Sequence, residues 1–129
     1  MRVFEVGQVL THERSFTDED VLAFQRLSGD SGRHHVKPGA SGRRMVHGLL
    51  TASIPTKLGG DIDYLAREMH FEFLRPVFVG DTVRCSAEIT EVLRETGRVR
   101  LTMAGACSNQ SGKEVLRFST RGVVLDDAE

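Results

Sequence analysis

Residues 46–60 read VHGLLTASIPTKLGG, and between Gly48 and Leu58 the only charged side chain is Lys57. The apolar positions cover most of the circumference that a helix would have here: Leu49, Leu50, Ala52, Ile54 and Leu58. A helix that is apolar on nearly every side is buried on nearly every side. The pattern therefore predicts a long central helix, kinked at Pro55 and ended by the glycine pair that follows Leu58.

The half of the chain that follows this helix alternates polar with apolar residues. Alternation with a period of two predicts antiparallel strands with one buried and one solvated face. Four strands are expected, over residues 64–74, 82–93, 98–108 and 113–125. Glycine-containing turns separate the four strands, at Gly80-Asp81, at residues 95–97 and at residues 109–112, and each turn has a residue that tolerates positive φ. A sheet of this length can curl around the helix, so we expect an α+β fold, with residues 1–129 as a single domain.

Before the central helix, residues 7–16 are compatible with a strand, and Thr17 with Asp20 forms a capping-box pattern that starts a short helix. Ser28-Gly29 ends that helix, because glycine tolerates left-handed dihedrals. Residues 30–44 are rich in glycine and poor in apolar side chains, which predicts an ordered loop. Loops on a rigid scaffold are where chemistry tends to sit.

Composition excludes several classes of function. The chain has 129 residues, 40% hydrophobic and 27% charged, with a formal net charge of −1. So small a net charge gives no long-range electrostatic attraction to nucleic acid or to an anionic membrane. No stretch approaches the ~18 uncharged residues that span a bilayer, and residues 1–9 carry no apolar leader. We therefore expect a cytoplasmic protein. Cys85 and Cys107 form no CxxC pair, so we expect two small core residues rather than a disulfide framework.

Three blocks carry a resemblance to a known family: residues 28–35 (SGDSGRHH), 46–53 (VHGLLTAS) and 73–82 (FLRPVFVGDT). In this order they resemble the MaoC-like acyl dehydratases, which include the (R)-specific enoyl-CoA hydratases. The likeness extends from about Gly7 to Val124. It implies the hotdog fold, a long helix wrapped by an antiparallel sheet, in a homodimer or a dimer of dimers. It also implies an enzyme that reversibly adds water to a trans-2-enoyl thioester.

Position by position, the resemblance implies that Asp30 and His35 bracket the reacting water. It implies that the Gly48 N–H binds the thioester oxygen and that the Thr56 hydroxyl holds the catalytic carboxylate. The chemistry agrees, because a positioned acid/base pair contributes roughly 10²–10⁴ in rate and an oxyanion donor on the order of 10²–10³. No prosthetic group is needed, since coenzyme A or phosphopantetheine is part of the substrate.

Each assignment has a simpler structural alternative. Gly48 can serve packing alone, and Thr56 can satisfy a buried backbone carbonyl. Arg33, Arg43 and Arg44 are expected to contact the phosphates of coenzyme A or of a phosphopantetheine arm, or else to form a solvated loop. The histidines lack HxH and HExxH spacing, so no metal site is expected.

The chain departs from the family pattern around the site. Gly32-Arg33 replaces the usual Asn-Pro, Lys37 replaces a frequent acid, and residues 35–47 form a shorter link than in the typical hydratase. His34 is a second imidazole beside the first, and spacing favours His35 as the catalytic one. A hotdog thioesterase, in which a carboxylate directs water at the carbonyl, and a non-catalytic acyl-thioester binding module both stay open as alternatives.

Overall fold

Five antiparallel strands form one twisted sheet in the spatial order β1-β3-β4-β5-β2. Their bounds are Val9–Ser15 (β1), Leu65–Phe73 (β2), Thr82–Glu95 (β3), Arg98–Ser108 (β4) and Glu114–Leu125 (β5). The computed structural model describes residues 3–126, so the ends of the expected domain, residues 1–2 and 127–129, lie outside the described part. The four strands expected in the second half of the chain are confirmed to within two residues.

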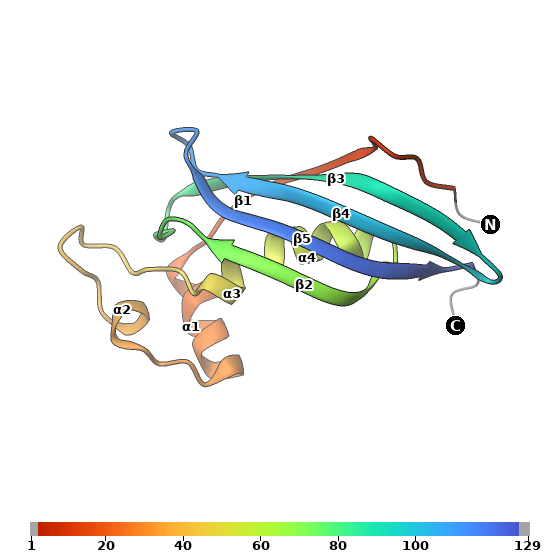
Figure 1. Cartoon of the computed structure of the whole chain (residues 1–129). Coiled ribbons are helices and arrows are strands. Elements are labelled where there is room, and N and C mark those ends of the chain that lie inside the picture. Colours follow the sequence, from red (N-terminus) through yellow and green to blue (C-terminus); the bar gives the residue numbers. More distant parts are fainter. Residues whose placement is uncertain (1–2, 127–129) are drawn as a thin grey trace.

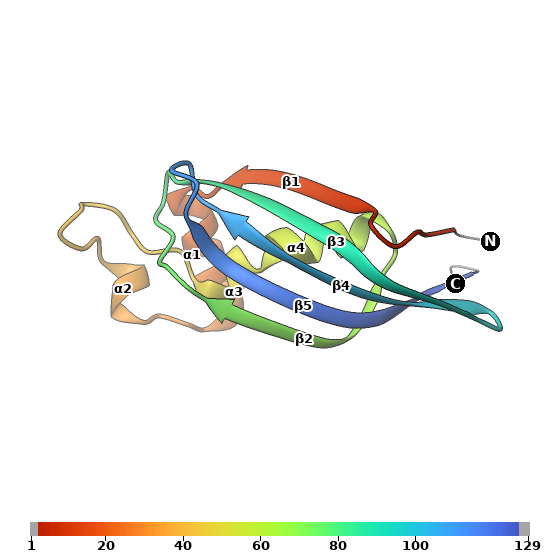
Figure 2. The same ribbon diagram turned by 45° about the horizontal axis from the view of Figure 1, so that its top comes forward.

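Four helical segments complete the fold: Asp18–Ser28 (α1), Arg33–Val36 (α2), Gly48–Thr51 (α3) and Ser53–Asp61 (α4). Figures 1 and 2 show α3 and α4 against one face of the sheet, while α1 and α2 gather beyond the end of the sheet that lies opposite the β3–β4 turn. The connection after α1, residues 29–32, and the connection after α2, residues 37–47, therefore both lie at this end of the molecule.

The local signals for α1 and for the turns are confirmed. Thr17 accepts the Asp20 backbone N–H at 3.1 Å and Asp20 accepts the Thr17 N–H at 2.9 Å, which is the expected capping box. Gly29 then ends α1 with φ 78°. Three turn glycines have φ between 76° and 93°, a region that glycine adopts freely: Gly80, Gly97 and Gly112.

The central helix differs from its expected form. It is interrupted at Ala52, three residues before Pro55, because the Pro55 ring removes an N–H donor and crowds the carbonyl of the preceding turn. It also continues through the glycine pair to Asp61, and the reversal falls on Asp63, with φ 56°. Thr56 and Lys57 are exposed, so the sheet covers one side of the helix rather than all sides.

The core lies between the helices and the inner face of the sheet. Its main cluster joins Val46, Leu50, Ile54 and Leu58 to strand residues that include Val83. Cys85 and Cys107, register partners on β3 and β4, are fully buried free thiols, as expected for core residues. Hydrogen bonding with the adjacent Cys85 thiol, together with burial, raises the pKa of the Cys107 thiol. Among the described residues, none of the helices is long and apolar enough to cross a membrane.

Candidate active site

The segment after α1 brings Asp30 and His35 together. Gly29 turns the chain out of α1, and the Asp30 Oδ1 then accepts the Gly32 N–H at 3.1 Å. α2 follows at once and carries His35, whose Nε2 lies 3.8 Å from the Asp30 Oδ2. This distance exceeds a direct hydrogen bond and leaves room for one bridging water.

A hydrogen bond from a third segment fixes the tautomer of His35. The His35 Nδ1 lies 2.8 Å from the Met45 carbonyl oxygen, which can only accept, so Nδ1 carries a proton. In the neutral imidazole the lone pair is therefore on Nε2, the nitrogen that faces Asp30. The His35 side chain is 6% exposed and that of Asp30 is 53% exposed. Two acceptors, one buried and one at the surface, thus face each other across a gap of one water.

The Asp30 carboxylate is stabilised in its charged form. The Gly32 N–H, followed by the nearby imidazoles of His35, His47 and His34, holds the pKa of Asp30 below its ordinary value. Asp30 is therefore a carboxylate at neutral pH, which is the state that a water-holding acceptor requires.

His47 connects this pair to the start of α3. Its Nε2 donates to the Asp30 backbone carbonyl at 3.0 Å, and its ring stacks on His35 with centroids 3.7 Å apart. His47 directly precedes the expected helix, but local sequence does not indicate its bond to Asp30, because the two residues are 17 positions apart. Within residues 3–126 the buried His47 Nδ1 has no hydrogen-bond partner.

Asp30, His35 and His47 form a cluster of possible metal ligands, in which one ligand atom from each residue lies within 4.8 Å of the other two. A metal ion must lie near the plane of each imidazole that binds it, along the nitrogen lone pair. The His35 and His47 rings are stacked with an interplanar angle of only 18°, so their lone pairs run side by side rather than toward one point. The geometry fits a hydrogen-bonded pair better than a shared ion.

Gly48 begins α3 directly after His47, so its N–H has no acceptor earlier in that helix. It lies in a cleft of about 310 Å³ that His34, His35, Phe73 and Arg75 also line. A Cβ on Gly48 would meet the Phe73 ring at 2.9 Å, so only glycine leaves both the ring and the backbone N–H undisturbed. The structure thus brings three expected residues, Asp30, His35 and Gly48, to one place.

Thr56 is not part of this group. Its hydroxyl donates to the Ala52 carbonyl at 3.0 Å, the common bond of a helical threonine to the preceding turn. The described residues show no bond from Thr56 to Asp30, so the expected link to the carboxylate is not found. The alternative, that Thr56 satisfies a backbone carbonyl, describes its contact.

Two of the three arginines have internal partners. The Arg43 Nη1 lies 2.9 Å from the Asp81 Oδ1, and the Arg44 Nη1 lies 2.7 Å from the Asp18 Oδ1. The Arg44 Nε also donates to the Val36 carbonyl at 3.0 Å. Both side chains therefore brace the loop before α3, and their expected contact with phosphates stays a prediction. Arg33 is exposed and forms no ion pair with any described residue.

Two aromatic residues of β2 line different spaces in the structure. Phe73 lines the cleft beside Gly48, whereas Phe71 lines an apolar pocket of about 120 Å³ between α4 and the sheet. Val83 is fully buried core. Arg75, which lines the cleft and donates to the Glu114 carbonyl at 2.7 Å, lies in the third quoted block but was not singled out there.

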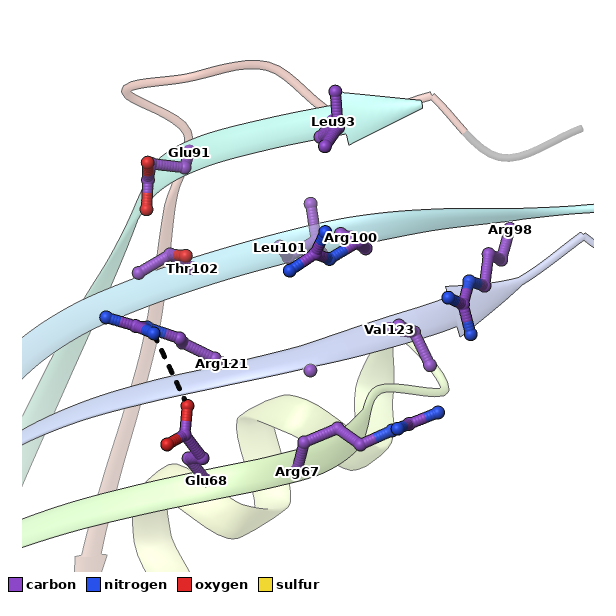
Figure 3. A pocket seen from close by; sticks show the side chains of 11 residues that line it. Arg67, Glu68, Glu91, Leu93, Arg98, Arg100, Leu101, Thr102, Arg121 and Val123 are labelled. Atoms are coloured by element: carbon purple, nitrogen blue, oxygen red, sulfur yellow. Dashed lines mark ion pairs between the residues drawn. The ribbon is translucent and has the colours of Figure 1, made fainter. Parts of the chain in front are cut away.

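A larger cavity, of about 370 Å³, lies elsewhere on the sheet and contains none of the expected site residues. Figure 3 shows its side chains on the strands with α4 behind them. Arg121 pairs with Glu68 at 3.5 Å, and Arg98 and Arg100 pair with Glu95 at 2.7 and 3.4 Å. These charges largely satisfy one another at the surface of the molecule.

Comparison with known proteins agrees with this geometry. A family model described as the thioesterase superfamily matches residues 40–106, which include Gly48 but neither Asp30 nor His35. The (R)-specific enoyl-CoA hydratase of Aeromonas caviae is 33% identical over 130 residues, covering 88% of this chain and 95% of that protein. The chain belongs to the MaoC-like acyl dehydratases.

Other members of this family extend the comparison. The 3-hydroxybutyryl-CoA dehydratase of Methylorubrum extorquens is 30% identical over 123 residues, covering 87% of this chain and 74% of that protein. The solved structure of an (R)-hydratase from A. caviae has a TM-score of 0.84 at 28% identity, covering 97% of this chain and 99% of that one. The hotdog fold is thereby confirmed, and the relatives are hydratases and dehydratases by name.

Proposed function

We propose that this MaoC-like protein catalyses the reversible hydration of a trans-2-enoyl thioester, or equally the dehydration of the 3-hydroxyacyl thioester. The observation that carries the proposal is the pair of facing acceptors: the Asp30 Oδ2 and the His35 Nε2, 3.8 Å apart. A water between them can donate one proton to each and keep an oxygen lone pair for attack. Names of relatives at 27–33% identity support the same class of reaction.

In the hydration direction the water oxygen bonds to C3 of the enoyl thioester while one of its protons passes to the Asp30–His35 pair. The electrons of the C2–C3 double bond move toward the thioester carbonyl, whose oxygen gains negative charge. The Gly48 N–H stabilises that oxygen. The pair then delivers a proton to C2, so that the net change is the addition of one water.

The rest of the assignment follows from access to the cleft. Of Arg33, Arg43 and Arg44, exposed Arg33 is the one without an ion pair to a described residue, so we expect it to contact a phosphate of the substrate. That phosphate belongs to the coenzyme A or phosphopantetheine part of the thioester. Phe73 borders the acyl portion. We also propose a homodimer, because the edge strand β2 leaves Leu65, Met69 and Phe73 about half exposed. The cytoplasmic location stays a prediction.

A thioesterase is the second candidate, because the matching family model carries that description. The same water would then attack the carbonyl carbon and release a free thiol. The thioesterase has less support, because the residues that this family model matches do not include Asp30 and His35, the pair proposed to hold the water.

The test uses crotonyl-CoA, with the enoyl-thioester absorbance and the free thiol followed together. We expect absorbance to fall without thiol release, and the rate to fall at least about a hundredfold in Asp30→Asn and in His35→Ala. A matched His12→Ala variant, altered at a histidine of β1 at the opposite edge of the sheet from β2, should retain the parent rate. Thiol release at the rate of absorbance loss would establish the thioesterase instead, and an inert parent chain would indicate a binding module.

A further inference from the structure

Arg75 brings a positive charge to the cleft that Gly48 and His35 line, and the proposed reaction does not use it. Its Nη1 donates to the Glu114 carbonyl at 2.7 Å, which fixes the guanidinium beside the start of β5. An arginine side chain has five N–H groups, and this bond takes one of them. The Arg75 side chain makes no other hydrogen bond to any residue from 3 to 126, so its remaining N–H groups are available to a ligand.

Arg75 also has no paired carboxylate among the described residues. None of the side chains that line the cleft is acidic. The carboxylate of Glu114 is taken by a different arginine, since its Oε1 lies 2.6 Å from the Arg117 Nη2. Arg117 lines a separate pocket with His70, away from the cleft. The two arginines therefore contact Glu114 without sharing a role.

Alternate residues of β2, and of the chain just beyond it, mark out the length of the site. Phe71 lines the apolar pocket between α4 and the sheet. Phe73 lies against Gly48, and Arg75 lines the same cleft two residues farther on. The backbone still runs beside β5 there, with the Arg75 N–H 3.4 Å from the Val115 carbonyl oxygen. A strand rises about 3.3 Å per residue, so each of these two steps is about 7 Å.

A thioester of coenzyme A or phosphopantetheine fits this order in one direction. Its acyl chain is apolar, whereas its pantetheine arm carries an amide two methylene groups beyond the sulfur. With the thioester oxygen at the Gly48 N–H, the acyl chain lies toward Phe71 and the arm lies toward Arg75. The thioester carbon and the carbon of this first amide are five bonds apart, about 6 Å at roughly 1.5 Å per bond. That separation matches the step from Phe73 to Arg75.

We propose that Arg75 is a substrate-binding residue, whose guanidinium donates to the first amide carbonyl of the pantetheine arm and so holds the thioester at Gly48. This inference rests on the proposed function, because it takes the thioester oxygen to lie at the Gly48 N–H. It names the part of the substrate that the cleft recognises. Coenzyme A and an acyl carrier protein share that part, and the contact does not involve a phosphate.

Two small thioesters of crotonic acid separate this amide from everything beyond it. The N-acetylcysteamine thioester keeps the first amide and ends there, whereas the S-pentyl thioester has a hydrocarbon chain of the same length. We expect the ratio of their kcat/KM values, amide over hydrocarbon, to fall about tenfold in Arg75→Met, because methionine fills similar space without a donor. Their inhibition constants against crotonyl-CoA give the same comparison independently of turnover.

Arg117→Met is the matched control, because it removes the other arginine that contacts Glu114. It should leave the ratio at the parent value. Melting temperatures should change little in either variant, because both arginine side chains are exposed.

The outcomes are distinct. An unchanged ratio in Arg75→Met would overturn the proposal, and so would a loss confined to crotonyl-CoA, which would assign Arg75 to a phosphate instead. Both outcomes leave the proposed function intact. The proposed function itself fails only if the parent does not hydrate crotonyl-CoA or if Asp30→Asn retains its rate.

Discussion

Asp30 and His35 are five residues apart, yet their useful geometry depends on atoms from outside their own loop. The Met45 carbonyl sets the tautomer of His35, and the His47 side chain holds the backbone of Asp30. Local sequence can place an acid and an imidazole in one turn. It cannot show which carbonyl will accept from which ring nitrogen, because that depends on how the loop folds back.

His47 is the clearest case for a mutation at this scale. His47→Phe keeps a ring between His35 and Phe24 but removes the donor to the Asp30 carbonyl. It also removes a buried Nδ1 that lacks a partner among the described residues, which by itself favours folding. We expect thermal unfolding by circular dichroism to be unchanged or shifted slightly upward, and kcat to fall about tenfold. Retained activity together with a much lower melting temperature would contradict this assignment.

At the scale of elements, the start of α3 at Gly48 places the Gly48 N–H where no helical carbonyl competes for it. The sequence predicted a largely apolar helix beginning at Gly48, but not its interruption at Ala52 or its exposed side. Periodicity reports which residues are apolar, whereas exposure depends on how far the sheet curls, which long-range pairing determines.

Gly48→Ala tests the role of this helix start. The new methyl group would meet the Phe73 ring at 2.9 Å, and that ring is 54% exposed, so it can turn away at little cost. The free energy of unfolding, measured by urea titration, should fall by less than about 1 kcal/mol. Turnover should fall about a hundredfold, because the new methyl group then keeps the thioester oxygen away from the residue 48 N–H. Phe73→Leu in the same chain should leave the loss in place if the N–H is what matters, and full recovery would show that Phe73 alone was obstructing the cleft.

At the scale of the whole molecule, Asp81 connects the loop before α3 to the sheet. Its Oδ2 accepts the Phe78 N–H at 2.9 Å, and its Oδ1 lies 2.9 Å from Arg43 and 3.0 Å from Gln110. Burial alone would raise the pKa of Asp81, but these three partners outweigh burial and hold that pKa below its ordinary value. Arg43 thus stabilises the loop before α3 through its ion pair with Asp81.

Asp81→Asn should lower the free energy of unfolding at pH 7 by about 1–2 kcal/mol. Because the folded pKa is depressed, the carboxylate stabilises the chain fully above its ordinary pKa of 3.8 and loses that contribution as the pH falls through the lower folded value. Parent and variant should therefore converge in stability below pH 3.8 in urea titrations at several pH values. A difference that stays constant with pH would mean that charge is not involved.

The fold was largely predictable because its signals are local: alternation marked β2 to β5, and Thr17 with Gly29 marked α1. The site was predictable only where a family resemblance added positions to that pattern. Arg43 and Arg44 show the limit, since their partners Asp81 and Asp18 are 38 and 26 residues away. The positions of charged residues along the chain do not indicate which arginine will form an ion pair within the folded protein.

The central claim, that Asp30 and His35 act on one water as a unit, is tested most directly by a double-mutant cycle on crotonyl-CoA hydration. Residues that act together are strongly non-additive. We predict that Asp30→Asn, His35→Ala and the double variant lose kcat to nearly the same extent. Independent losses that multiply in the double variant would contradict the claim.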